Sequence, residues 1–396
     1  NIVHLVLART PDAPEGVKGI SLFVVPKYLV DDQGRPGRRN DVWCQSIEHK
    51  LGIKASPTAV LLYGDDKGEV GAGAIGYLIG EENRGLEYMF VMMNAARFAV
   101  GVQGIAVAER AYQQAVAYAK DRLQSRDVAG SSGAVPIIRH PDVRRMLMTM
   151  RAHTEAARAL ACVAAAASDA GHHAADEAAR RENMAVYEFL VPIVKGWSTE
   201  MSLEVTSLGV QVHGGMGFIE ETGAAQHYRD ARILTIYEGT TAIQANDLIG
   251  RKTARDGGAV ARALIAKVRE TEAQLSARGG ADLTAIAGRL SAGRAALEAA
   301  VDFMVGAFKG DVRAAFAGSV PYLKLAGVVL SGWQMARAAL AADELLKAGD
   351  GDAEFLASKI ATARFHADHL LTQAGALLAA ATEGAAGVLA MPETAF

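Results

Sequence analysis

One stretch of this chain places a single acidic residue where it could act as a base. Over residues 232–244, an apolar approach leads to Glu238, which is followed by Gly239 and Thr240. A carboxylate beside apolar side chains can have a raised pKa, which suits a general base near neutral pH. Gly239 permits close backbone approach to a ligand, and Thr240 can cap a helix and present donors to an anion. The alternative is an ordinary carboxylate at a helix N-terminus, which the helix dipole favours.

A second stretch is rich in glycine and follows an apolar segment. Residues 208–218 include Gly214, Gly215 and Gly217. Glycines at this density let the backbone approach a phosphate closely. A helix C-cap followed by a loop explains the same pattern. His213 has no metal-binding or acid–base partner near it in the sequence, and we interpret it as structural.

A third stretch, residues 118–126, ends a helical segment with Arg122, Gln124 and Ser125. The guanidinium group of an arginine offers paired donors that match a pyrophosphate. The alternative is a solvated basic helix terminus, which the helix dipole also favours.

The elements that carry these stretches differ between the start of the chain and the remainder. Residues 1–80 contain short runs rich in Val, Leu and Ile at 2–8, 20–25, 59–63 and 76–79, separated by Gly, Pro and Asp. This pattern predicts a small antiparallel sheet or barrel.

Apolar residues recur at three- and four-residue steps in the remainder of the chain, and this spacing predicts helices. The first four are expected at residues 85–124, 142–170, 182–208 and 240–251. Four more are expected at about 258–278, 282–309, 318–346 and 352–385. Long helices joined by short links are typical of antiparallel bundles, so the expected fold class is mainly α with a β part.

The composition excludes several classes of protein. With 396 residues, 51% hydrophobic residues and 21% charged residues, the chain has the profile of a globular protein with a large core. Its formal net charge of -3 gives no basic face for nucleic acid. The two cysteines form neither a metal-binding spacing nor a disulfide framework, which favours a reducing compartment. No apolar run reaches the ~18 residues of a membrane span.

Together, the three stretches have the order and rough spacing found in acyl-CoA dehydrogenases, which this chain resembles over residues 1–254. The segments 51–58 and 76–86 are similar to the barrel-to-bundle junction of that family, and residues 140–147 fit its next helix. The tail resembles the extra helical domain of a bacterial subgroup. That subgroup includes broad-range fatty acyl-CoA and 3-methylmercaptopropionyl-CoA dehydrogenases.

The resemblance implies a partial β-barrel middle domain, an antiparallel helical bundle and an additional C-terminal helical domain. Their expected bounds are 1–80, 81–254 and 255–396. The family's N-terminal helical domain and one barrel strand should precede Asn1, so we expect the natural polypeptide to begin further upstream. The chain also departs from the family at Ser125-Arg126, where Phe-Gly is common, and at Ala242, where Gln is common.

The resemblance also implies roles for individual residues. Glu238 would take the α-proton of an acyl-CoA thioester while FAD accepts the β-hydride, and the N–H of Glu238 would help to hold the thioester oxygen. The alternative position of the base in this family corresponds to Ala96, which cannot act as one. The expected substrate-binding residues are Asn94, Arg97, Tyr237 and Gly239. The expected FAD-binding residues are Arg122, Gln124, Ser125, Gln211, Gly214, Gly215 and Thr240. No metal is expected.

The implied partners are an acyl-CoA substrate and an electron-transfer flavoprotein as acceptor, in a homo-oligomer (dimer or tetramer) of the bacterial cytoplasm. The expected role is in fatty acid β-oxidation or related acyl-CoA catabolism, without nucleic acid or a membrane span. An acyl-CoA oxidase that uses oxygen remains an alternative. Further alternatives are a non-catalytic flavoprotein of the same fold, in which we expect a basic surface, and a scaffold subunit that pairs with a catalytic partner.

Overall fold

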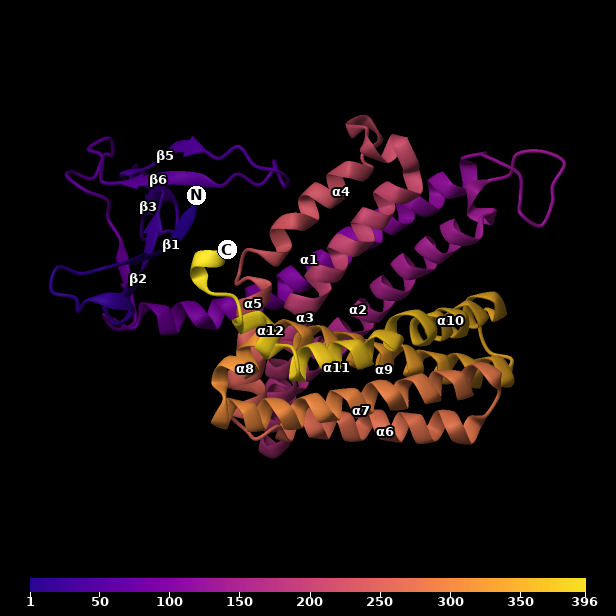
Figure 1. Cartoon of the computed structure of the whole chain (residues 1–396). Helices are drawn as coiled ribbons and strands as arrows, with labels where there is room; N and C mark the ends of the chain where they lie inside the picture. The colour runs from indigo at the N-terminus through magenta and orange to yellow at the C-terminus, as the bar shows by residue number, and fades with distance from the viewer. The chain divides into compact units, whose positions relative to one another are not determined.

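A computed structural model describes all residues from Asn1 to Phe396, with 69% of them in helices and 9% in strands. The expected fold class, mainly α with a β part, is confirmed. The chain forms two compact units, Asn1–Ala96 and Arg97–Phe396, and the chemistry-bearing stretches identified above all lie in the second (Figure 1).

The first unit contains three small antiparallel sheets. In the largest, β1 (Val3–Ala8) pairs with β2 (Ser21–Pro26), which pairs with β7 (Tyr77–Ile79). The other two join β3 (Tyr28–Val30) to β4 (Pro36–Arg39) and β5 (Val42–Ile47) to β6 (Ala59–Tyr63). The sequence predicted β1, β2, β6 and β7. It did not predict β3, β4 and β5. The strand β3 is apolar but only three residues long, whereas β4 and β5 contain arginine, glycine, proline or polar residues in place of a continuous apolar run.

Three long helices dominate the start of the second unit. They are α1 (Gly85–Asp121, which begins in the first unit), α2 (Pro141–His173) and α3 (Glu177–His213). All three were predicted. α3 extends beyond the predicted 182–208 at both ends, and Asp176 caps its start by accepting from the N–H of Ala179 at 2.8 Å. α2 and α3 pack against each other along a face rich in buried alanine.

The predicted fourth helix, residues 240–251, changes type partway along. The structure has α5 (Thr241–Asp247), which continues as a π-helical turn, η6 (Leu248–Ala254). A further short helix, α4 (Ala224–Ala231), and the 3-10 turn η5 (Arg232–Thr235) precede it. Their local sequence is too short and too polar to show a helical period, so the prediction did not include them.

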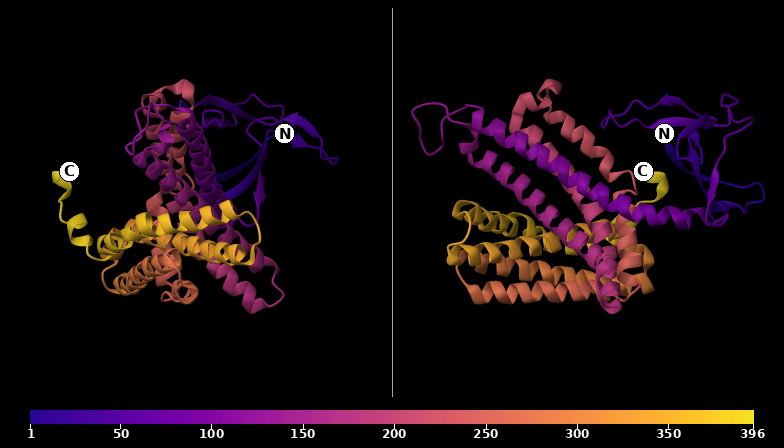
Figure 2. Two further views of the ribbon diagram at one scale, coloured as in Figure 1. Left: turned by 90° about the vertical axis from the view of Figure 1, so that its right-hand side faces the viewer. Right: turned by 180° about the vertical axis from the view of Figure 1, so that it is seen from behind.

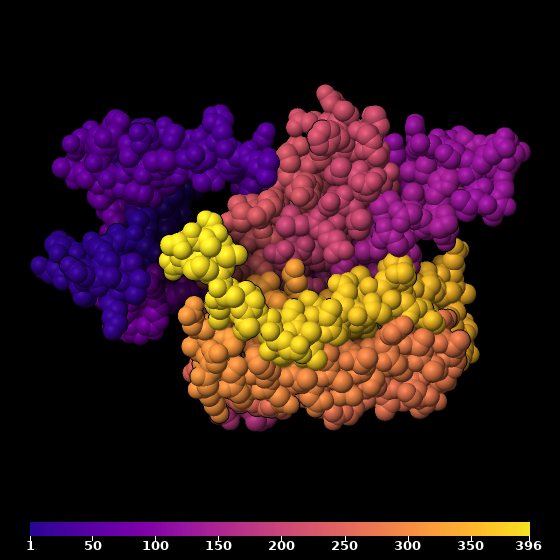
Figure 3. All heavy atoms as spheres, viewed as in Figure 1, coloured from indigo at the N-terminus to yellow at the C-terminus, as the bar shows by residue number.

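A helical module completes the chain. It consists of α6 (Ala259–Arg278), α7 (Ala281–Gly310), α8 (Val312–Ala317), α9 (Ser319–Ala348), α10 (Ala353–Phe365), α11 (Ala374–Thr382) and α12 (Ala385–Leu389). α9 is the central helix and contacts α6, α7, α10 and α11 as well as α2, α3 and α5 (Figure 2). The space-filling view shows the last helices of the chain, which include α10 and α11, lying along the orange surface of the module (Figure 3), and both helices contact α7.

The predicted last helix, residues 352–385, is interrupted. A π-helical turn, η7 (His366–Leu370), and a 3-10 turn, η8 (Leu371–Gln373), separate α10 from α11. The side chain of His366 is buried in this break, where its ring lies against Gly332 of α9. Burial lowers the pKa of His366 to about 3, with a smaller contribution from the charge of His153.

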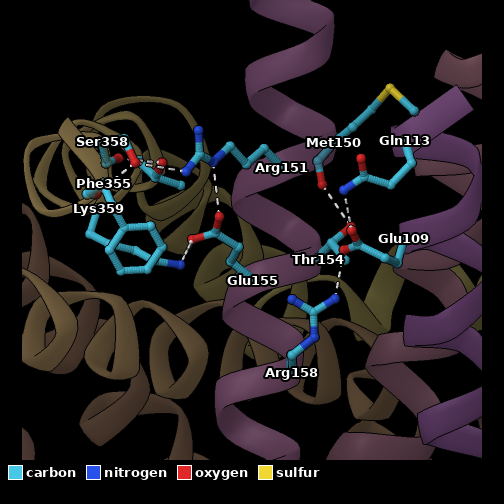
Figure 4. Close-up of polar contacts among 11 residues, drawn as sticks. Glu109, Gln113, Met150, Arg151, Thr154, Glu155, Arg158, Phe355, Ser358 and Lys359 are labelled. Atoms are coloured by element: carbon cyan, nitrogen blue, oxygen red, sulfur yellow. Dashed lines mark hydrogen bonds and ion pairs between the residues drawn. The ribbon is translucent and has the colours of Figure 1, made fainter. Parts of the chain in front are cut away.

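Close contacts join this module to the long helices. A Cβ atom added to Gly327 of α9 would lie 2.2 Å from Cγ of Trp197 on α3, so only glycine fits there. Glu155 of α2 accepts from Arg151 at 2.9 Å and from Lys359 of α10 at 2.8 Å (Figure 4). Arg151 also donates to Ser358 at 3.0 Å, so one carboxylate organises a polar link between α2 and α10.

Two helices are long and apolar enough, by length and composition alone, to cross a membrane. In α9, 78% of the apolar window is buried within the protein, which is usual for a central core helix, and in α1 the share is 28%. One or two such helices are weak evidence for a membrane span. The expectation that the chain has no span therefore stays a prediction.

Candidate active site

A strained turn carries the proposed base. Glu238 has φ 55° and Gly239 has φ 91°, so two successive residues adopt the left-handed region. For a residue other than glycine this conformation costs about 1–2 kcal/mol, and it persists only where surrounding contacts hold it. The turn lies between η5 and α5, and the side chain of Glu238 is half-buried. The N–H of Glu238 donates to no acceptor within the chain, so it remains free to bind an external oxygen.

Two buried side chains hold the carbonyl groups of this turn. Nε2 of Gln244 donates to the carbonyl oxygen of Glu238 at 3.2 Å and to that of Gly239 at 3.4 Å. Nζ of Lys195, from the middle of α3, donates to the carbonyl oxygen of Gly239 at 2.5 Å. Both Lys195 and Gln244 are 0% exposed. A Cβ atom on residue 239 would lie 2.7 Å from Nε2 of Gln244, so Gly239 is required by space as well as by φ.

The residues that flank the turn are tied to α1 and α3. The hydroxyl of Tyr237 donates to Oε1 of Gln103 on α1 at 2.5 Å. Burial raises the pKa of Tyr237, and the charge of Glu238 adds to the effect. Thr240 caps α5 by accepting from the N–H of Ile243 at 3.4 Å. The hydroxyl of the next residue, Thr241, donates to Oε1 of Glu200 on α3 at 2.6 Å.

A pocket of about 640 Å³ lies elsewhere, between α2, α3, α6 and α9, and contains none of the predicted site residues. A second pocket, of about 380 Å³, is lined instead by the end of α1 and the residues that follow it, by residues 137–146 at the start of α2 and by the end of α3. Five of the residues predicted to bind FAD line this second pocket, which we term the diphosphate pocket after the group that they are predicted to hold: Arg122, Gln124, Ser125, Gln211 and Gly214. The structure thus brings together two stretches that lie about 90 residues apart in the sequence. Gly215 follows Gly214 but does not line the pocket, and Thr240 belongs to the strained turn.

The walls of the diphosphate pocket are fixed by backbone bonds and ring stacking. The N–H of Gln124 donates to the carbonyl of Val135 at 3.0 Å, and that of Ile137 donates to the carbonyl of Arg122 at 2.8 Å. The ring of His213 stacks on Tyr118 with centroids 4.4 Å apart, and its Nδ1 lies 2.7 Å from the carbonyl of Gly209. This placement gives His213 a structural role.

The electrostatics of the diphosphate pocket suit an anion. Its lining contains an arginine, two histidines and the amides of Gln124 and Gln211, and no carboxylate. Arg122 is exposed, so its guanidinium group can reach a ligand. The volume of about 380 Å³ lies within the range that is usual for small-molecule and cofactor pockets.

The two residues predicted to bind substrate on α1 lie in different surroundings. Arg97 is 6% exposed, and its Nη1 lies 3.7 Å from Oδ2 of Asp247. Asp247 also contacts Nε of Arg251 at 2.5 Å. Arg97 is therefore held inside the protein by an ion pair. Asn94 is exposed and belongs to the first compact unit. No group of histidine, cysteine or carboxylate side chains in the described chain could hold a metal ion.

Sequence reasoning missed Lys195 and Gln244. A lysine within the apolar run Phe189–Trp197 was a usable signal, because a lysine among core residues is almost never buried without a partner. Gln244 ends the stretch 232–244, but the sequence assigned it no role. Nothing in the sequence indicated that these two side chains meet at the same turn, because they are 49 positions apart in the chain.

Comparison with known proteins identifies relatives of both helical parts. The family model described as "Acyl-CoA dehydrogenase, C-terminal domain" matches residues 83–252, and that described as "Acetyl-CoA dehydrogenase C-terminal like" matches residues 264–392. A 3-methylmercaptopropionyl-CoA dehydrogenase of Ruegeria pomeroyi is 58% identical over 95% of this chain and 62% of its own length. The broad-specificity linear acyl-CoA dehydrogenase FadE5 of Mycobacterium tuberculosis is 37% identical over 94% of this chain and 62% of its own length.

Among solved structures, an acyl-CoA dehydrogenase from Bacillus anthracis complexed with FAD has the same fold. It aligns with a TM-score of 0.70 and 20% identity over 99% of this chain and 62% of the other. The chain thus spans less than two thirds of the length of the relatives that it matches.

Proposed function

The chain belongs to the acyl-CoA dehydrogenase family, and on that premise we propose that the protein converts an acyl-CoA thioester to the trans-2-enoyl-CoA. The observation that carries the proposal is the strained turn that presents Glu238. A left-handed glutamate held by two buried donors is costly to maintain, and such strain is concentrated at functional sites.

In the proposed reaction, Glu238 accepts the α-proton of the thioester. As that proton leaves, negative charge develops on the thioester oxygen, and the free N–H of Glu238 is a donor that can stabilise it. Bound FAD supplies the acceptor for the β-hydride, so one proton and one hydride leave the substrate and a carbon–carbon double bond forms. Tyr237 and Gly239 flank the base, and we assign them to the wall of the acyl site.

The diphosphate pocket is the proposed place for part of the FAD. Its residues fit that group: Arg122 provides paired donors for a diphosphate, and Gln124 and Gln211 provide amide donors. Ser125 and Gly214 complete the wall, and Gly214 leaves the backbone accessible because it carries no side chain. We keep Gly215 and Thr240 as proposed FAD contacts, and Asn94 and Arg97 as proposed CoA contacts, on the family resemblance alone.

The wider assignment follows the family as well. We propose residues 1–80, 81–254 and 255–396 as middle domain, catalytic bundle and extra helical domain. We also propose an electron-transfer flavoprotein as acceptor, a homodimer or tetramer, a cytoplasmic location and a role in β-oxidation or related acyl-CoA catabolism.

The test uses the full-length natural protein loaded with FAD. Anaerobic addition of butyryl-, octanoyl- and 3-methylmercaptopropionyl-CoA should bleach the flavin band with at least one thioester. Glu238→Gln should abolish the bleaching, whereas the control Glu221→Gln, an exposed carboxylate nearby in the chain, should leave it unchanged. Full bleaching in Glu238→Gln would exclude Glu238 as the base, and a bound flavin that no thioester reduces would exclude the dehydrogenase assignment.

A further inference from the structure

A fully buried lysine, Lys195, lies in the middle of α3 and is 0% exposed. A buried ammonium group is unfavourable unless it is paired and hydrogen-bonded. Its hydrogen-bond partner is not a carboxylate but the carbonyl oxygen of Gly239, at 2.5 Å from Nζ. That carbonyl belongs to the residue immediately after Glu238, so the buried cation is bonded to the turn that carries the base.

The turn depends on donors from outside it. Glu238 and Gly239 both have positive φ, and neither conformation is stabilised by a helix or a strand. The amide of Gln244 reaches both carbonyls, but at 3.2 and 3.4 Å these are long bonds. The bond from Lys195 is the shortest of the three, and its donor is charged. Hydrogen bonds with a charged donor are stronger than those between neutral groups, so this bond contributes most to holding the turn.

The charges around Lys195 come from three different elements. Arg97 of α1 repels its ammonium group, whereas Glu200 of α3 and Glu238 of the turn attract it. Burial is the largest effect, and together these interactions lower the pKa of Lys195 to about 8. The side chain is therefore mainly protonated at neutral pH, and its positive charge lies within electrostatic reach of the Glu238 carboxylate.

We propose that Lys195 is the positioning residue for the base: its ammonium group, bonded to the carbonyl of Gly239, holds Glu238 in the left-handed turn and keeps a positive charge beside its carboxylate. This inference rests on the proposed function, because it presumes that Glu238 removes the α-proton. A neighbouring cation favours the ionised form of a carboxylate, which is the form that can accept a proton.

Two substitutions in the full-length, FAD-loaded protein separate positioning from simple packing. Lys195→Met keeps the length of the side chain and removes the charge and the donors, whereas Lys195→Arg keeps a permanent charge. The matched control is Lys252→Met, which removes another largely buried lysine, one that lies in η6 and pairs with Glu188 of α3. The readouts are backbone amide hydrogen exchange over residues 233–244 and the rate of flavin reduction by the best thioester as a function of pH.

We expect Lys195→Met to speed amide exchange over residues 233–244 and to slow flavin reduction by about tenfold or more, as for the loss of one charged hydrogen bond, with little change in KM. The wild-type rate should fall above about pH 8 as Lys195 loses its proton, and this decline should be absent in Lys195→Arg. Lys252→Met should change neither the exchange nor the pH profile.

The inference is overturned if Lys195→Met reduces flavin at the wild-type rate, or if its rate falls while amide exchange over residues 233–244 stays unchanged. If Lys195→Met does not fold, Lys195→Arg decides: a pH decline identical to that of the wild type contradicts the proposal. Failure of the proposed function itself would look different, because Glu238→Gln would then be as active as the wild type.

Discussion

Gly239→Ala is the most direct perturbation of the strained turn. Alanine at φ 91° costs about 1–2 kcal/mol in backbone strain. Its Cβ would lie 2.7 Å from Nε2 of Gln244, so the amide must move away from both carbonyls that it bonds. Each lost bond costs about 1 kcal/mol, which gives a predicted loss of about 3–4 kcal/mol in the free energy of unfolding.

The matched control is Gly349→Ala, at the end of α9. Gly349 has φ 72°, and an added Cβ atom there would meet no atom within 4 Å. This variant carries the backbone strain without the collision, so we expect it to lose about 1–2 kcal/mol. Both variants can be followed by urea unfolding with tryptophan fluorescence, because Trp197 and Trp333 are buried in the same compact unit as the two glycines.

The difference between the two variants measures the contribution of the Gln244 bonds. We predict that Gly239→Ala is less stable than Gly349→Ala by about 2 kcal/mol, which corresponds to two hydrogen bonds. Equal losses in the two variants would refute the reasoning, because they would mean that Gln244 contributes nothing to the turn.

Three further outcomes are expected. Lys195 has a pKa of about 8 in the folded protein against 10.5 in the unfolded chain, so between these values only the unfolded chain keeps the proton. The stability of the wild type relative to Lys195→Met should therefore rise by up to roughly 3 kcal/mol as pH increases through this window, and a flat difference in urea titrations would contradict it. His366 has a pKa of about 3 in the folded protein against 6.5 in the unfolded chain, so the unfolded chain binds the proton more readily. Relative to His366→Leu, the wild type should therefore lose about 1.4 kcal/mol of unfolding free energy for each pH unit below 6.5. Thermal unfolding scans in which the two proteins respond to pH in the same way would rule this out. Glu155→Gln leaves Arg151 and Lys359 without their shared carboxylate and should lower the free energy of unfolding by about 1.5–3 kcal/mol in urea at low salt. The exposed control Glu177→Gln should lower it by under about 1 kcal/mol. Similar losses in the two variants would contradict the link between α2 and α10.

The long helices could be predicted from the sequence because their signal is local. Apolar residues at three- and four-residue steps located α1, α2 and α3 and the main helices of the tail module. The same local signal failed where the helix changes type. The π-helical turns η6 and η7 contain the same kinds of residues as the helices around them, so periodicity alone joined them into continuous helices.

The residues of the candidate site were likewise predictable only in part. The family motifs located Glu238 and the residues of the diphosphate pocket, and five of those FAD residues line one pocket in the structure. Lys195 and Gln244 could not be placed, because their role depends on contact between α3 and a turn 44 residues further along the chain. For Arg97 the family resemblance implied a role, but the sequence did not reveal that its side chain is buried beside Asp247.

The contact between Gly327 and Trp197 ties the helical module formed by α6 to α12, here called the tail module, to the long helix α3, so the module cannot be treated as fully separable. The indole ring of Trp197 occupies the space that a side chain at position 327 of α9 would need. There is therefore no layer of solvent between α3 and α9 at this point. A chain truncated after residue 254 would expose the face of α3 that carries Trp197, as well as the hydroxyl of Thr253 that now lies 3.1 Å from Tyr322. Exchanging this tail for that of a relative would succeed only where the relative also provides glycine opposite the indole, so the two helical parts are constrained to change together.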